Sequence, residues 1–194
     1  MIKKFDILKK YSTWVLKLSG GADSALILYY MNKIRTNEDL WILTGVNDND
    51  QNYDGHARDV IQFLQVKNAT HILYPQTHET GDEKLILDHS FYDKIACVFE
   101  PGSTIGVQGR TLNPPFHIDG EEENRNGDSP MIEHVNGHVL YRPWYDVDKK
   151  QIVKAYREEN LMTLFSMTRS CVSLTEEKCG RCFWCKEREW ACET

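Results

Sequence analysis

Near its N-terminus the chain reads Trp14-Val15-Leu16-Lys17-Leu18-Ser19-Gly20-Gly21-Ala22-Asp23-Ser24, and an apolar stretch follows over residues 25–33. The first five residues are typical of a short buried strand, and residues 25–33 are typical of a helix. The residues between them therefore predict a tight strand-to-helix turn. Two adjacent glycines let the backbone of such a turn bend sharply and approach a ligand closely.

The chemistry of this turn favours phosphate binding. Backbone N–H groups of the turn and of the first helical turn point towards one spot, which suits phosphate oxygens. Asp23 would repel a phosphate, so its presence indicates a Mg²⁺ ion between the carboxylate and the phosphates. The plainer alternative is a turn in which Ser24 or Asp23 merely caps the helix. The complete string in this position predicts a phosphate-binding loop, called the phosphate loop below, formed by Ser19, Gly20, Gly21, Ala22, Asp23 and Ser24.

Outward from this loop, strands and helices alternate. Apolar runs over residues 40–46, 71–74 and 104–107 predict strands, and residues 56–65 and 84–99 predict helices. This alternation is typical of an α/β fold, with a parallel sheet and helices on both of its faces. Residues 109–131 have loop chemistry and form either a solvated insertion or an active-site lid.

A hairpin and a capped helix follow the loop region. Asn136-Gly137 separates residues 132–135 from residues 138–141, which predicts a β-hairpin. His134 and His138 flank that turn and are expected at the surface. Asp148 is a candidate N-cap for an amphipathic helix over residues 149–160, in which Ile152, Val153 and Tyr156 face inward.

Cysteine is concentrated at the C-terminal end. Five of the six cysteines lie in residues 171–194, and four of them have the spacing C-x7-C-x2-C-x2-C. Thiolates at this spacing can surround one tetrahedral Zn²⁺ ion. An iron–sulfur cluster and four unliganded thiols are the alternatives. Cys97 is expected in the core, and Cys192 has a poorer spacing as a substitute ligand. The predicted metal ligands are Cys171, Cys179, Cys182 and Cys185.

Composition limits the possible partners and compartments. The 194 residues carry 29 acidic and 23 basic side chains, a net charge of −6, which does not favour binding to bulk nucleic acid. No apolar run reaches the roughly 18–20 residues of a membrane span. Lysines interrupt the N-terminal segment, so no secretory signal is expected there. A cytoplasmic location is expected, where clustered cysteines indicate metal ligands rather than disulfides.

The turn segment resembles the S-G-G-x-D-S motif of the N-type ATP pyrophosphatases, the PP-loop superfamily. The resemblance implies an adenine nucleotide α-hydrolase-like fold and ATP cleavage between the α- and β-phosphates. A second segment, from Pro143 to Lys149, is similar to a P-L-x-D-x-x-K stretch of that superfamily. There the lysine begins a helix near the phosphates, which gives Lys149 a catalytic role beside Asp23. A surface lysine in the first turn of a helix is the alternative.

The loop and the cysteine segment together resemble the 7-cyano-7-deazaguanine synthases (the QueC family). Arg188 and Ala191 also fit the R-x-x-A tail that follows the last zinc ligand of that family. Two segments depart from the family pattern: residues 44–51, and residues 88–91, which read Asp-His-Ser-Phe. The insertion with its Asn136-Gly137 hairpin is also unlike that family. These departures concern the acceptor substrate more than the nucleotide chemistry.

The resemblance implies an ATP-dependent carbon–nitrogen ligase of queuosine biosynthesis. Its substrates would be ATP with Mg²⁺, the deazapurine 7-carboxy-7-deazaguanine, and ammonia. It implies an ATP pyrophosphatase domain over residues 1–165, with residues 109–142 as an insertion and hairpin, and a zinc-binding segment over residues 166–194. A homodimer is also implied. Two alternatives stay open: adenylylation of another nucleobase or acceptor, and a non-catalytic zinc-ribbon module that binds nucleic acid through Lys178, Arg181, Lys186 and Arg188 with nearby aromatic residues.

Overall fold

The computed structural model describes residues 1–46, 53–75, 95, 99–118, 130–135, 137–171 and 178–193. Within these residues, one six-stranded sheet has the order β3-β2-β1-β4-β6-β5. Neighbouring strands are parallel except for β5, which pairs antiparallel with β6. The strands are β1 (Thr13–Lys17), β2 (Asp39–Val46), β3 (Ala69–Pro75), β4 (Thr104–Val107), β5 (Ile132–Val135) and β6 (His138–Tyr141).

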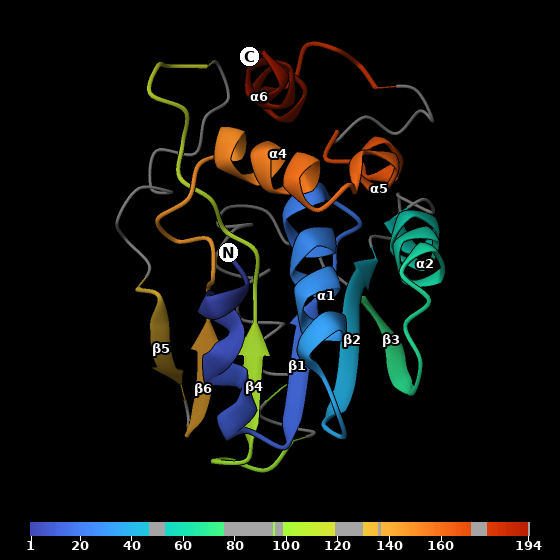
Figure 1. The fold of residues 1–194 in the computed structure, drawn as a ribbon, viewed down its shortest axis with the longest axis vertical. Helices are drawn as coiled ribbons and strands as arrows, with labels where there is room; N and C mark the ends of the chain where they lie inside the picture. Colours follow the sequence, from blue (N-terminus) through green and yellow to red (C-terminus); the bar gives the residue numbers. More distant parts are fainter. Residues whose placement is uncertain are drawn as a thin grey trace.

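Helices flank this sheet, which establishes a mixed α/β fold. A 3-10 helix, η1 (Ile2–Lys10), and α1 (Ala22–Ile34) lie against one face, and α4 (Lys149–Glu158) crosses the N-terminal end of α1 (Figure 1). The C-terminal α6 lies beyond α4, on the side away from the sheet. The other helices among the described residues are α2 (Tyr53–Phe63), α5 (Met162–Met167) and α6 (Phe183–Cys192).

Successive side chains of β1 point to opposite faces of the sheet, and each face has its own part of the hydrophobic core. Trp14 and Leu16 point into a cluster that includes apolar residues of η1, α1 and α4. Val15 points the other way and belongs to a second cluster with Leu43, Leu140 and Ile95. Side chains of successive strand residues point to opposite faces, so a strand buried on both faces is apolar throughout.

The order of strands reverses beside β1. The chain passes from β1 outward through β2 to β3, and then returns to place β4 on the other side of β1. Ligands of open parallel sheets bind at such a switch point, beyond the carboxyl ends of the two strands. The residues that follow β1 and β4 are therefore the first place to search for a site.

Most of the expected elements are confirmed. The strand expected over residues 104–107 and both strands of the hairpin have the expected bounds, and Asp148 caps α4 with a capping box to Gln151. One expectation was wrong: His138 is only 6% exposed, although His134 is exposed. The reason is that β6 lies between β4 and β5, which buries the whole strand. The helix expected over residues 84–99 lies largely outside the described residues.

The capping box gives a first prediction. Asp148 accepts a hydrogen bond from the backbone N–H of Gln151, whose side chain accepts one from the backbone N–H of Asp148. Replacing Asp148 by Ala should lower the free energy of unfolding by about 1 kcal/mol, because the backbone N–H of Gln151 loses its acceptor. Urea denaturation measures this loss. Lys154→Ala, an exposed change in the same helix, serves as the control, and equal stabilities of the two variants would contradict the capping role.

Candidate functional site

The turn from Ser19 to Ser24 lies at the switch point, between the end of β1 and the start of α1. Gly20 has a φ of +74°, in the left-handed region that favours glycine. A Cβ atom at Gly20 would also lie 2.6 Å from the Cβ of His56, in the first turns of α2. Gly20 is therefore required both by its own conformation and by the close approach of α2.

The first turn of α1 has no side-chain cap among the described residues. Gly21 is the N-cap, so neither Asp23 nor Ser24 caps the helix. The hydroxyls of Ser19 and Ser24 lie 3.2 Å apart, and the Ser24 hydroxyl also donates to the carbonyl of Gly21. These contacts shape the loop from within. The first N–H groups of a helix have no partner inside it, so this end can accept an anion.

Asp23 is held by Lys149, the first residue of α4. The Nζ atom of Lys149 lies 2.5 Å from Oδ2 of Asp23, although the two residues are 126 positions apart. Lys149 is only 4% exposed, so it is not the surface lysine of the alternative interpretation. The other carboxylate oxygen of Asp23, Oδ1, has no hydrogen-bond partner within the described part of the chain. A carboxylate oxygen in this position fits a ligand of Mg²⁺.

Two buried aromatic residues fix the backbone of the same turn. The indole N–H of Trp144 donates to the carbonyl of Asp23 over 3.1 Å, and the hydroxyl of Tyr156 donates to the carbonyl of Ala22 over 2.7 Å. Both side chains are fully buried. The apolar pattern of the sequence indicates no site role for Trp144, and it predicts Tyr156 only as a core residue. Another sequence feature does point to a site role for Trp144. This residue lies between Pro143 and Lys149, in the segment whose resemblance implies a place near the phosphates.

Gly109 completes the loop from the side of β4. A Cβ atom there would lie 3.1 Å from the Cβ of Asp23 and 3.3 Å from the backbone nitrogen of Ser24. The segment after β4 thus passes directly against the first turn of α1. From the sequence, Gly109 is expected only as a loop residue, because nothing local to it reveals this close approach.

The four predicted metal ligands come together. The sulfur atoms of Cys171, Cys179, Cys182 and Cys185 all lie within 4.8 Å of one another, and those of Cys171 and Cys182 are 4.0 Å apart. Four sulfurs around one Zn²⁺ at the usual bond length would be about 3.8 Å apart. The cluster therefore fits a tetrahedral zinc ion. Cys192 is exposed and is not part of the cluster, and Cys97 lies outside the described residues.

The turn between the ligands also suits a metal site. Gly180 has a φ of +69°, which allows the tight turn from Cys179 to Cys182. Backbone N–H groups of Arg181 and Cys182 lower the pKa of Cys179 to about 6, whereas burial raises the pKa of Cys185 to about 12. These N–H groups therefore favour the thiolate form of Cys179. A bound metal would displace the remaining thiol protons.

The cysteine segment is attached to the phosphate loop at one end. The backbone N–H of Arg169 donates to the carbonyl of Gly20 over 3.0 Å, two residues before Cys171. At the other end, α6 docks through Arg188, which donates to Thr168 over 2.9 Å and to the carbonyl of Phe165. The Arg188 guanidinium also lies 3.8 Å from the ring centre of Phe165. The metal segment is thus part of the same body as the loop.

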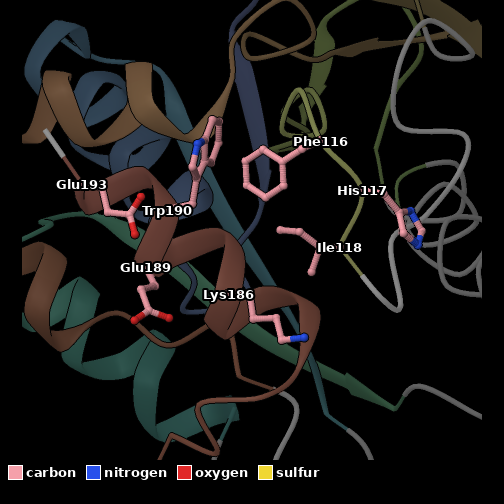
Figure 2. Close-up of a pocket in the computed structure, with 7 residues that line it drawn as sticks. All are labelled: Phe116, His117, Ile118, Lys186, Glu189, Trp190 and Glu193. Atoms are coloured by element: carbon pink, nitrogen blue, oxygen red, sulfur yellow. The ribbon is translucent and has the colours of Figure 1, made fainter.

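An open groove of about 310 Å³ lies between residues 116–118 and α6 (Figure 2). Phe116 and Trp190 form its aromatic part, with ring centres 5.6 Å apart and the rings nearly perpendicular. No residue of the phosphate loop belongs to its lining, which consists of Phe116, His117, Ile118, Lys186, Glu189, Trp190 and Glu193. The groove is therefore a surface separate from the loop.

Some predictions from the sequence concern residues outside the described ranges, and others stay untested. Residues 88–91 and most of residues 44–51, the two departures from the resembled family, lie outside the described residues. The division into two domains and the nucleic-acid alternative stay predictions. Within the described ranges, the helices are all too short or too polar to cross a membrane.

Gly20 and Gly55 offer a matched pair of substitutions. Gly20→Ala should lower the free energy of unfolding by about 1–3 kcal/mol, because it forces a left-handed conformation on an L side chain and collides with His56. Gly55 lies in α2 with nothing within 4 Å of an added Cβ. Gly55→Ala should therefore stabilise the protein by up to about 1 kcal/mol. Thermal and urea unfolding measure both changes, and a neutral Gly20→Ala would contradict the geometry of the loop.

The cysteine cluster predicts a measurable metal content. The full chain should carry about one zinc ion per molecule, and Cys182→Ser should lose it because three ligands and a hydroxyl hold zinc weakly. Cys192→Ser is the control and should keep the metal. Elemental analysis by mass spectrometry gives both values. Iron in place of zinc, or four thiols that react freely with a thiol reagent, would contradict this assignment.

Comparison with known proteins supports the fold alone. No model of a protein family matches the chain, and no curated protein matches it. Among solved structures, the chain is similar to NMN synthetase from Francisella tularensis, with a TM-score of 0.53 and 15% sequence identity. The match covers 91% of this chain and 74% of that one. The mostly parallel sheet flanked by helices is thus an arrangement that the chain shares with an enzyme of known structure.

Proposed function

We propose that the protein is an ATP-dependent ligase that binds ATP at the turn from Ser19 to Ser24 and transfers AMP to a carboxylate. The observation that carries this proposal is the turn itself. It lies at the switch point of a parallel sheet, its helix end is uncapped within the described residues, and a buried lysine holds its aspartate. The likeness in fold to a synthetase and the resemblance to the PP-loop superfamily support the same class of activity.

The first step joins the acceptor to AMP. An oxygen of the acceptor carboxylate attacks the α-phosphorus, and the bond from that phosphorus to the bridging oxygen breaks, releasing pyrophosphate. This activation is needed because a carboxylate oxygen is a poor leaving group, whereas AMP is a good one. Catalysis of such a transfer is chiefly positioning and stabilisation of charge.

Residues of this chain supply both effects. The N–H groups at the start of α1 bind phosphate oxygens, and Gly20 and Gly21 let the backbone approach them. The ammonium of Lys149 offsets the charge that develops on the pyrophosphate. Asp23 would hold a Mg²⁺ ion through Oδ1, and that ion would supply further charge neutralisation between the phosphates and the carboxylate.

The second step forms a carbon–nitrogen bond. Ammonia attacks the acyl carbon, AMP leaves, and the nitrogen loses a proton to give an amide. On the resemblance to the 7-cyano-7-deazaguanine synthases, we propose 7-carboxy-7-deazaguanine as the acceptor. A second adenylylation, at the amide oxygen, followed by loss of AMP and of the amide protons, would then give the nitrile. The zinc site, with all four positions filled by cysteines, has a structural role in this scheme.

The proposal is tested by the products made from ATP. With Mg²⁺, ammonium and 7-carboxy-7-deazaguanine, the full chain should release AMP and pyrophosphate rather than ADP and phosphate. Lys149→Gln should lower that rate on the order of 100-fold, because it removes a buried charge beside the phosphates. Lys154→Gln, an exposed change in the same helix, is the control and should leave the rate unchanged.

Each outcome of this assay has a distinct meaning. AMP release that needs the deazaguanine supports both the chemistry and the acceptor. AMP release that ignores this compound, yet is lost in Asp23→Ala, would retain the chemistry and reject the acceptor. ADP as the product, or no AMP above background, would contradict the proposed function.

A further inference from the structure

Helix α6 carries a buried carboxylate that faces the site. Three residues of α6 are buried, and they lie four positions apart: Phe183, Glu187 and Ala191. Glu187 is only 1% exposed, whereas Glu189 and Glu193 of the same segment are exposed. A carboxylate in this position is costly to bury unless a cation lies near it. The Nζ atom of Lys149 lies 3.8 Å from Oε2 of Glu187.

Lys149 therefore has two carboxylate neighbours from opposite ends of the chain. Oδ2 of Asp23 lies 2.5 Å from Nζ on one side, and Oε2 of Glu187 lies 3.8 Å from it on the other. The three formal charges sum to −1. If Asp23 turns to a cation bound with the nucleotide, Glu187 remains as an anion beside the lysine. The buried ammonium of Lys149 would then lose Asp23 as a partner but would keep the negative charge of Glu187 beside it.

The position of Glu187 depends on the cysteine cluster. Cys182 is the N-cap of α6, Cys185 lies in its first turn, and Glu187 follows two residues later. The ligands that would close around a metal are thus the residues that set the start and direction of this helix. Arg188 holds the same turn against Thr168 and Phe165.

We infer that Glu187 is a positioning residue for Lys149, and that it makes the geometry of the phosphate loop depend on the metal state of the cysteine cluster. Glu187 keeps the ammonium beside Asp23 and the start of α1. The effect on ATP rests on the proposed function, but the contact between Glu187 and Lys149 does not. If Glu187 served only to pack α6, the charge of its side chain would not matter to Lys149.

The contact is tested first without nucleotide. The zinc-loaded full chain is treated briefly with acetic anhydride, and the modification of Lys149 is followed by peptide mass spectrometry relative to the exposed Lys154. Glu187→Gln should raise the rate at Lys149 by about threefold or more, because the ammonium is held on one side only. Glu187→Asp keeps the charge on a shorter side chain and should fall between the two. Glu189→Gln is the control and should behave as the natural chain.

Removal of the metal tests the dependence on the cluster. A chelator should raise the modification of Lys149 in the natural chain and should add little in Glu187→Gln, because the same contact is already lost. Equal modification of Lys149 in the natural chain and in Glu187→Gln would overturn the inference. If the chelator raised the modification of Lys149 equally in the natural chain and in Glu187→Gln, the link to the cysteine cluster would be overturned.

A second measurement connects the contact to ATP. Calorimetry with Mg²⁺ and α,β-methylene-ATP should show binding weakened by about tenfold in Glu187→Gln. That loss should vanish in a Lys149→Gln background, because Glu187 acts through Lys149. An equal loss in both backgrounds would overturn the positioning role. If the natural chain does not bind the analogue while Lys149 still responds to Glu187→Gln, the proposed function fails and the positioning role stands.

Discussion

The ion pair between Lys149 and Asp23 joins the two parts of the chain on which the site depends. It ties the first residue of α4 to the first turn of α1, across 126 positions of sequence. Both groups are largely withdrawn from water, where an ion pair is strong only if its geometry is good and its remaining polar groups are satisfied. Trp144 and Tyr156 fix the backbone on which Asp23 stands, since each donates to a carbonyl of the same turn, whereas Oδ1 of Asp23 has no partner among the described residues. With α2 against Gly20 and the segment after β4 against Asp23, the loop is enclosed by four elements that meet only in the folded protein.

The segment that carries the cysteines contacts the loop and Lys149 from outside. It begins next to the loop, where the N–H of Arg169 donates to Gly20, and it ends in α6, which returns Glu187 to Lys149. A short segment with little core of its own needs such support, and a metal bound by four thiolates can supply it. The cysteine cluster and the turn from Ser19 to Ser24 are therefore parts of one structure rather than separate modules. A zinc ion held by the four cysteines would act on the loop through this connection, although its four protein ligands leave no open position for a substrate.

Local signals predicted the strands, the loop and the metal ligands, because each depends on residues close in sequence. The apolar run of β1, the paired glycines and the spacing of the cysteines are of this kind. Gly109 and the burial of His138 could not be predicted, since both follow from the order of strands in the sheet. Glu187 has only a weak sequence signal, since it stands between Phe183 and Ala191 in a stripe of buried residues at helical spacing. Its partner could not be read from that stripe, because the docking of α6 on α4 is a tertiary contact.

The proposed chemistry depends on phosphate binding at the start of α1. A crystal structure of the full chain with Mg²⁺ and α,β-methylene-ATP, in which a carbon replaces the scissile bridging oxygen, tests this binding. We expect phosphate oxygens within hydrogen-bond distance of the backbone N–H groups of residues 20–24. We also expect Asp23 bound to the cation and the ammonium of Lys149 beside the phosphates. A nucleotide bound elsewhere on the molecule, with Lys149 still paired to Asp23 and no phosphate at the loop, would contradict the proposed binding.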